Sequence, residues 1–302
     1  MSDQELLAGY ADVWWQAIDD FTGLLESLDA EDWDRPTDLP GWDVRAVASH
    51  IAHLERVLAT GEEETADLGD PVPAHITGLM GHYTEIGVVN RRDAAPDALI
   101  NEIREAATAR RTALLTDPPT DADATPERTF AGVPWTWRVL LRNRPLDVWM
   151  HEQDVRRAVG RPGGMDTVPA KHTAEYLAES LGFVLAKKVG AEPGTTLVLE
   201  MAGSDPFAFE VGEDRRGKAL PEVPAAAPDV RLAMDRESFV CLAGGRRPAP
   251  GAVRIEGDEA LGQRVVGQGV GAGLDHNRFR SVCLGQGQNG VVQHVGHFLV
   301  VE

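Results

Sequence analysis

The chain has 302 residues, of which 43% are hydrophobic and 25% are charged, and its formal net charge is −19. This length exceeds the usual single-domain range and the composition is that of a soluble globular protein, so we expect two domains. The excess of acidic residues argues against nucleic acid and anionic membrane surfaces as partners, because binding phosphates requires clustered Lys and Arg.

Targeting signals and cysteine spacing further limit the class of protein that the sequence can encode. No apolar run approaches the length of a membrane span, and the first residues, Met-Ser-Asp-Gln-Glu, lack the basic and hydrophobic regions of a signal peptide. Cys241 and Cys283 do not have the spacing of metal ligands and suggest reduced thiols. We therefore expect a cytoplasmic enzyme or binding protein that forms a monomer or a homodimer.

The first half of the chain has the pattern of a helical bundle. Apolar residues recur at three- and four-residue steps over residues 4–28, 43–58, 97–115 and 135–159, which predicts four long helices around a shared core. Residues 75–89 could form a shorter helix near a site. Pro145 lies inside the last pattern, so we expect either a kink or a restart with Pro145 in the first turn.

Asp147, His151 and Asp154 share one face of the last predicted helix. A carboxylate and an imidazole one turn apart suit a divalent metal such as zinc, but two ligands do not make a site. On spacing alone, a solvated surface pair is the more common explanation.

A third ligand could come from the second predicted helix, which Asp43 opens as N-cap after the Pro40-Gly41 turn. His50 falls on the apolar stripe of this helix and points toward the core. A lone core-facing histidine is usually a packing residue, whereas one that faces an Asp-x-x-x-His helix is a candidate ligand. His53 falls nearer the edge of the stripe, and we expect it at the surface or in the layer behind the ligands.

Two segments carry a family resemblance: Leu39-Pro-Gly-Trp-Asp-Val-Arg with His50, and Asp147-Val-Trp-Met-His151-Glu-Gln-Asp-Val-Arg. They closely resemble the mycothiol-dependent maleylpyruvate isomerase family, and the resemblance spans roughly residues 1–268. It implies a DinB-like four-helix metal-binding domain followed by a smaller α+β domain. The family's zinc ligands, one histidine and an acid-x-x-x-His pair, correspond to His50, Asp147 and His151. The isomerase has Glu at the position of Asp147, whose shorter side chain still ligates zinc.

The resemblance also implies a mechanism with Zn²⁺, or another divalent metal, as cofactor and mycothiol as thiol cosubstrate. Three protein ligands leave one open position on zinc, and a thiol that enters it loses its proton. The thiolate adds to an activated double bond of a small-molecule substrate, allows rotation about the resulting single bond, and leaves again. If the thiol stayed attached or displaced a leaving group, the protein would be a thiol S-transferase.

Two other classes of function fit the same residues. A metal-dependent hydrolase would place water in the open position, with Asp154 or Glu152 as general base. A non-enzymatic small-ligand-binding or regulatory protein would use the bundle only as a scaffold. A carboxylate substrate would require a cationic clamp. The candidates are Arg156, Arg157, Arg246, Arg247 and Arg254, of which we rank only Arg254, because it lies at alternating strand spacing beside Ile255.

The spacing of apolar residues along the chain changes after Arg161-Pro-Gly-Gly, which we interpret as a linker between two domains. A helix is predicted over residues 169–189, strands over 195–201, 207–211, 229–234 and 252–256, and further helices after the caps Asp235 and Asp258. We assign residues 1–160 to the bundle and 161–268 to an α+β domain similar in pattern to sterol-carrier-protein-like domains. Residues 269–302, rich in Gly and Gln, form an atypical tail that we place outside the catalytic fold.

Overall fold

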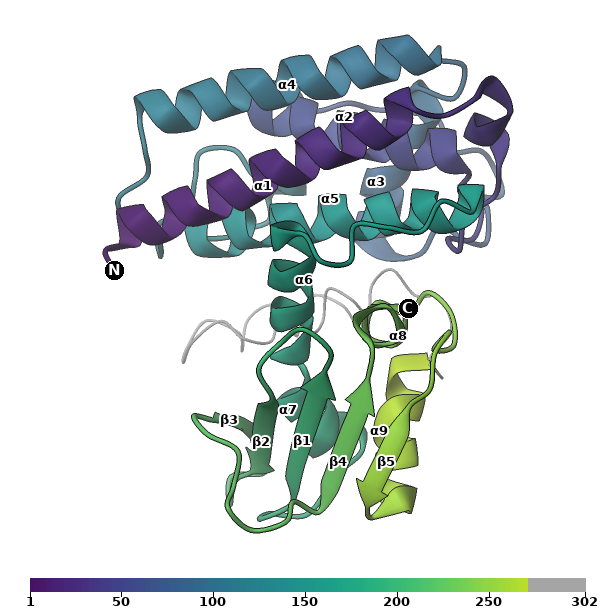
Figure 1. Cartoon of the computed structure of the whole chain (residues 1–302). Coiled ribbons are helices and arrows are strands. Elements are labelled where there is room, and N and C mark those ends of the chain that lie inside the picture. The colour runs from purple at the N-terminus through teal and green to yellow at the C-terminus, as the bar shows by residue number, and fades with distance from the viewer. Residues whose placement is uncertain (271–302) are drawn as a thin grey trace. The chain divides into compact units, whose positions relative to one another are not determined.

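A computed structural model describes residues 1–270, which form two compact units (Figure 1). The first unit spans Met1–Tyr176 and the second begins at Leu177. All but the first two residues of the predicted tail lie outside the described residues.

The first unit is helical, as the sequence predicts. Its elements are α1 (Asp3–Glu26), the 3₁₀ turn η1 (Ala30–Asp34), α2 (Val44–Thr60), α3 (Gly78–Asn90), α4 (Pro96–Thr116), the 3₁₀ turn η2 (Phe130–Gly132), α5 (Trp137–Val159) and most of α6 (Val168–Ala178). The helices predicted over 4–28, 43–58, 97–115 and 135–159 are thus confirmed as α1, α2, α4 and α5, and the segment 75–89, which the sequence left open, contains most of α3.

The apolar faces of the long helices meet in one core. Helix α1 packs against α4 and α5, and α2 packs against α3, α4 and α5. Trp14 and Phe21 of α1, Ile51 of α2, Ile103 of α4 and Val148 of α5 belong to the same buried cluster. Burial of this apolar surface, rather than helix propensity, supplies most of the driving force for the arrangement.

Helix α5 is continuous through Pro145, so the predicted restart at this residue is wrong. The helix begins after the N-cap Thr136, whose side chain accepts a hydrogen bond from Val139 N (3.3 Å). A proline inside a helix leaves carbonyl groups of the preceding turn without their usual donor. The missing N–H of Pro145 would pair with the Leu141 carbonyl, and in the same turn the Arg142 carbonyl lies 2.8 Å from Nε2 of the His172 ring.

The second unit contains a small mixed sheet with helices. Its elements are the rest of α6, α7 (Leu181–Phe183), the π-helical turn η3 (Val184–Lys188), β1 (Thr196–Met201), β2 (Phe207–Val211), β3 (Gly217–Leu220), β4 (Val230–Met234), α8 (Arg236–Ala243), β5 (Arg254–Gly257) and α9 (Glu259–Val270). The strand order is β3-β2-β1-β4-β5, with β1 and β4 parallel and the other neighbours antiparallel. Figure 1 shows α7 and α9 behind this sheet.

Most predicted elements of the second unit are confirmed, including the caps. Asp235 accepts a hydrogen bond from Ser238 N (2.6 Å) at the start of α8, and Asp258 accepts one from Leu261 N (2.9 Å) at the start of α9. Strand β3 was not predicted, because Gly217-Lys-Ala-Leu220 is short and has no alternation of buried and exposed positions.

The single helix predicted over residues 169–189 is wrong, because the chain leaves the α-helical path after Ala178. The Ser180 hydroxyl donates to the Leu177 carbonyl (2.6 Å), which offers the backbone an alternative to the helical pairing. Gly182 then approaches Gly217 so closely that a Cβ at Gly217 would overlap the Gly182 carbonyl. The break therefore lets this segment pack backbone to backbone against β3.

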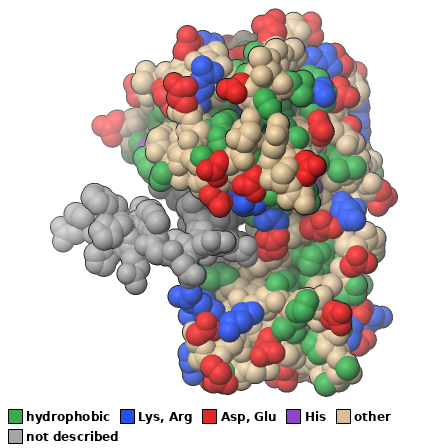
Figure 2. Space-filling model, turned by 90° about the vertical axis from the view of Figure 1, so that its left-hand side faces the viewer, with side chains coloured by type: hydrophobic (Ala, Val, Ile, Leu, Met, Phe, Trp, Pro, Cys, Tyr) green, Lys and Arg blue, Asp and Glu red, His purple; other side chains and the backbone are tan. Residues whose placement is uncertain are grey.

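The surface carries both signs of charge. On the face shown in Figure 2, acidic side chains are spread over the protein rather than gathered in one patch. Within residues 1–270, none of the helices combines the length and apolar character that crossing a membrane requires.

Candidate metal centre

His50 is held in the core of the first unit by α2. Asp43 caps this helix by accepting a hydrogen bond from Ala46 N (2.8 Å), and the apolar stripe of α2 then carries His50 inward, where the side chain is 4% exposed. Within residues 1–270, neither ring nitrogen of His50 has a hydrogen-bond partner. Burial lowers the pKa of His50 to about 4, despite the nearby Asp147 carboxylate. At neutral pH the ring is therefore uncharged and offers a lone pair.

Asp147 and His151 approach His50 from α5. His50 Nε2 lies 3.5 Å from Asp147 Oδ2, and His151 Nε2 lies 3.7 Å from Asp147 Oδ1. The two histidine rings meet edge to face with centroids 4.8 Å apart. One possible ligand atom from each of His50, Asp147 and His151 lies within 4.8 Å of the other two. In the described part of the chain, residues 1–270, these three side chains are the group that could hold a metal ion.

The Asp147 carboxyl is ionised by its surroundings. Burial favours its neutral form, but the Arg144 guanidinium and the two histidines outweigh this and hold its pKa well below the usual range. Arg144 Nη1 donates to Asp147 Oδ2 at 2.7 Å. The Asp147 side chain keeps 23% exposure, so the cluster is open to solvent on its side.

Asp154, predicted as a weak catalytic candidate, lies behind His151. It is completely buried, and its Oδ2 lies 3.1 Å from His151 Nδ1, the nitrogen that does not face Asp147. Arg157 Nη2 donates to the other oxygen of Asp154 (2.6 Å), and Arg157 Nε donates to Asp38 (2.9 Å). A carboxylate on the outer nitrogen fixes the ring and directs the lone pair of Nε2 toward the cluster.

Trp42 forms a wall of the cluster that the sequence did not indicate as functional. Its ring lies 5.1 Å from the His50 ring and 6.0 Å from the His151 ring, centroid to centroid. Trp42 Nε1 donates to Glu85 Oε2 (2.9 Å), a buried acceptor on α3. The sequence signal that could have identified Trp42 is its position directly before the N-cap Asp43. Nothing in the local sequence identifies Glu85 as its acceptor.

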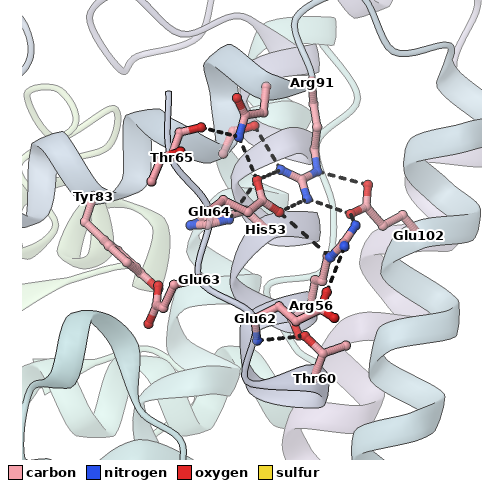
Figure 3. Close-up of polar contacts among 12 residues, drawn as sticks. His53, Arg56, Thr60, Glu62, Glu63, Glu64, Thr65, Tyr83, Arg91 and Glu102 are labelled. Atoms are coloured by element: carbon pink, nitrogen blue, oxygen red, sulfur yellow. Dashed lines mark hydrogen bonds and ion pairs between the residues drawn. The ribbon is translucent and has the colours of Figure 1, made fainter. Parts of the chain in front are cut away.

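His53, predicted near the surface or behind the ligands, is completely buried and belongs to a separate polar cluster (Figure 3). Its Nδ1 lies 3.5 Å from Glu64 Oε2. Arg91 donates to both Glu64 (2.6 Å) and Glu102 (2.6 Å), which ties the acidic segment after α2 to α3 and α4. The surface expectation is wrong because α3 covers this face of α2 at Gly87, where a Cβ would overlap the His53 side chain.

Arg254, the candidate clamp for a carboxylate substrate, lies on β5 of the second unit. Its side chain is 66% exposed, and its Nε lies 3.2 Å from Glu256 Oε1. The arrangement on β5 is that of a surface ion pair, so the role of Arg254 stays a prediction.

The donor set of the cluster fits a divalent metal. It combines a neutral imidazole with unpaired nitrogens, an ionised carboxylate and a second imidazole oriented by Asp154. Three protein ligands of these kinds are characteristic of catalytic rather than structural zinc sites, because one position stays open. Fold and site together define a two-unit protein with a candidate divalent-metal centre in its helical unit.

Comparison with known proteins identifies the family. Residues 14–156 match the mycothiol maleylpyruvate isomerase N-terminal domain, and residues 171–264 match the MDMPI C-terminal domain. The chain therefore belongs to the mycothiol-dependent maleylpyruvate isomerase family, as the resemblance in the sequence indicated.

Solved structures are similar in fold. A crystal structure of the mycothiol-dependent maleylpyruvate isomerase matches with a TM-score of 0.54, and a variant of it with one histidine replaced by alanine matches with 0.53. In both cases the identity is 19%, and the alignment covers 85% of this chain and 95% of the other. No curated protein matches the sequence significantly.

Proposed function

We propose that this protein is a zinc-dependent, mycothiol-using enzyme of the maleylpyruvate isomerase type, with His50, Asp147 and His151 as the metal ligands. The observation that carries the proposal is the convergence of these side chains from α2 and α5, with their ligand atoms within 4.8 Å of one another. Family membership supplies mycothiol as the thiol.

The residues around the cluster have separate tasks in this proposal. A bound divalent metal supplies positive charge that stabilises the thiolate form of an incoming thiol. Asp147 and the two histidines hold that charge, Asp154 keeps the His151 ring in place, and Trp42 covers one side of the two rings. The thiol comes from outside the protein, in agreement with a ligand group that contains no cysteine and with Cys241 buried in the second unit.

The reaction we propose is thiol addition and elimination on a small molecule. The thiolate sulfur forms a bond to one carbon of an activated double bond, whose π electrons move to the activating group. Rotation about the new single bond and loss of the thiolate then give the isomer. With a leaving group on the substrate, the same thiolate attack would give an S-conjugate, the product of a transferase.

The hydrolase alternative finds no support in the positions of its proposed bases. Asp154 pairs with His151 and Arg157, and Glu152 accepts from Arg156 Nε at 2.6 Å. A general base must be free to take a proton from water at the open position. Both carboxylates are buried and paired with arginines, although Oε2 of Glu152 has no hydrogen-bond partner among the described residues.

Finer aspects of the fold belong to the same proposal. We assign the helical unit to the DinB-like four-helix type and the sheet unit to the sterol-carrier-protein-like type, with 1–160 and 161–268 as the functional domains. The described helices and the mixed five-stranded sheet support these assignments.

Metal analysis followed by thiol titration tests the function. We expect one zinc per chain after purification without chelator, and mycothiol binding that releases a proton, seen by calorimetry in two buffers of different ionisation enthalpy. Zinc without thiol binding would contradict the thiol-enzyme proposal. A chain that takes up no divalent metal would contradict the ligand assignment as well.

A further inference from the structure

A buried network of charged residues links the four long helices of the first unit. At its centre is Glu55 of α2, which is completely buried. Glu55 Oε1 accepts hydrogen bonds from Trp14 Nε1 of α1 (3.0 Å) and from Arg144 of α5, at Nε (3.1 Å) and Nη2 (2.7 Å). Glu55 Oε2 accepts one from Arg110 Nη1 of α4 (3.3 Å).

Arg144 extends this network to the candidate metal centre. Its side chain is completely buried, and its remaining donor, Nη1, points the other way and donates to Asp147 Oδ2 at 2.7 Å. The planar guanidinium thus bridges a carboxylate on α2 and a carboxylate on α5 with two of its edges. The central carbon of this guanidinium lies over the Phe130 ring, 5.4 Å from the ring centroid.

Stability alone is a weak explanation for such a network. Removing an arginine and a carboxylate from water costs free energy that their attraction only partly returns, and apolar replacements of buried pairs are often neutral or stabilising. The network also ends on a proposed ligand. Glu55 lies on the helix of His50, and Arg144 lies one turn before Asp147, so the bridge joins the two helices that supply all the ligands.

We propose that Arg144 is a positioning residue for the metal centre and that Glu55 is the anchor that holds it. The proposal rests on the proposed function of His50, Asp147 and His151. Arg144 donates to Oδ2 of Asp147 and fixes the rotation of its carboxylate, which would then hold a bound ion in a defined orientation. This anchoring compensates for the short reach of an aspartate, which must be presented accurately to ligate.

The test is the zinc affinity of the full chain after the bridge has been removed by taking away one negative and one positive charge together; Arg110 then keeps its buried position but loses its ionised partner. The double variant E55Q/R144M keeps the net charge, and the single amide oxygen at position 55 can still accept from Trp14 or from Arg110. In the same unit, Arg91 and Glu64 form a matched control, with Nη2 to Oε1 at 2.6 Å and Nη1 to Oε2 at 2.9 Å (Figure 3). The control variant is E64Q/R91M.

Zinc dissociation constants are measured on chelator-stripped protein by competition with a chromophoric chelator, and Co²⁺ absorption spectra report the ligand geometry. We expect E55Q/R144M to bind zinc about 10–100-fold more weakly and to show an altered Co²⁺ spectrum. E64Q/R91M should keep the parent affinity and spectrum. A folded E55Q/R144M with the parent affinity and spectrum would overturn the proposal.

A second variant covers the case in which E55Q/R144M does not fold. R144K keeps the buried positive charge, but an ammonium cannot donate along two edges, so we expect weaker zinc binding here too. Parent affinity in R144K would then overturn the role of Arg144. The proposed function fails separately: a parent chain that binds no zinc, or a His50→Ala variant that binds it unchanged, refutes the ligand set before Arg144 is in question.

Discussion

The rings of His50 and His151 meet edge to face with centroids 4.8 Å apart, although one belongs to α2 and the other to α5. The carboxylate of Asp147 lies within 4 Å of both rings, at 3.5 Å from His50 Nε2 and 3.7 Å from His151 Nε2. Without a cation, two imidazoles and a carboxylate in a buried site leave ring nitrogens without partners, as His50 shows.

His50→Ala and His151→Ala should each abolish stoichiometric zinc binding while the helices stay folded. Each change removes one of three ligands and leaves the apolar core of the unit in place. Elemental analysis gives the zinc content, and circular dichroism gives the helical content. His82→Ala on α3, outside the cluster, is the control and should keep the metal. Stoichiometric zinc in both site variants would refute the assignment.

Asp154→Asn should weaken zinc binding about tenfold, because an amide no longer stabilises and orients the His151 ring as a carboxylate does. The control is Asp38→Asn, which removes the other carboxylate partner of Arg157 (2.9 Å) but leaves the His151–Asp154 contact intact. Competition titrations on both variants check the prediction. Equal zinc affinity in the two variants would show that Asp154 has no special role.

The metal-free protein should lose stability as the pH falls from about 6.5 to about 4. Burial lowers the pKa of His50 to about 4 in the fold, so over this range the unfolded chain binds the proton and the folded chain does not. The contribution of His50 to the free energy of unfolding is present in full above about pH 6.5. It falls by about 3 kcal/mol, an order-of-magnitude value, by pH 4.

Urea unfolding of the chelator-stripped chain, followed by circular dichroism at several pH values, measures this loss. His50→Gln removes the titrating group and should make the free energy of unfolding less dependent on pH. Asp147 acts in the same direction at lower pH, because its lowered pKa gives stability that is lost only as the carboxylate is finally protonated. The same pH dependence in the parent and in His50→Gln would be evidence against the burial argument.

Gly87→Ala should destabilise the helical unit by about 1–3 kcal/mol, because the added Cβ overlaps the buried His53 side chain where α3 crosses α2. Gly23→Ala on α1 is the matched control, since a Cβ at Gly23 meets nothing within 4 Å. Alanine there should be neutral or stabilise by up to about 1 kcal/mol. Thermal unfolding of both variants compares them, and equal midpoints would contradict the packing at Gly87.

The sequence predicted the local elements well. Helices α1, α2, α4 and α5 follow from apolar residues at three- and four-residue steps, and Asp43, Asp235 and Asp258 act as the caps that their positions indicated. These features depend on neighbours within about one turn, so a short window contains the information. The spacing of Asp147 and His151 is likewise a local property of one helix.

The tertiary structure alone decided which residues meet. The Glu55–Arg144–Asp147 bridge, the Glu85 acceptor of Trp42 and the burial of His53 join helices that are distant in sequence. The break after Ala178 and strand β3 also depend on a long-range contact, the approach of Gly182 to Gly217. Such contacts depend on how the packed helices and strands are rotated and shifted relative to one another. An apolar pattern specifies only which face of an element is buried. The sequence by itself therefore determined the elements and suggested ligands, and packing decided their partners.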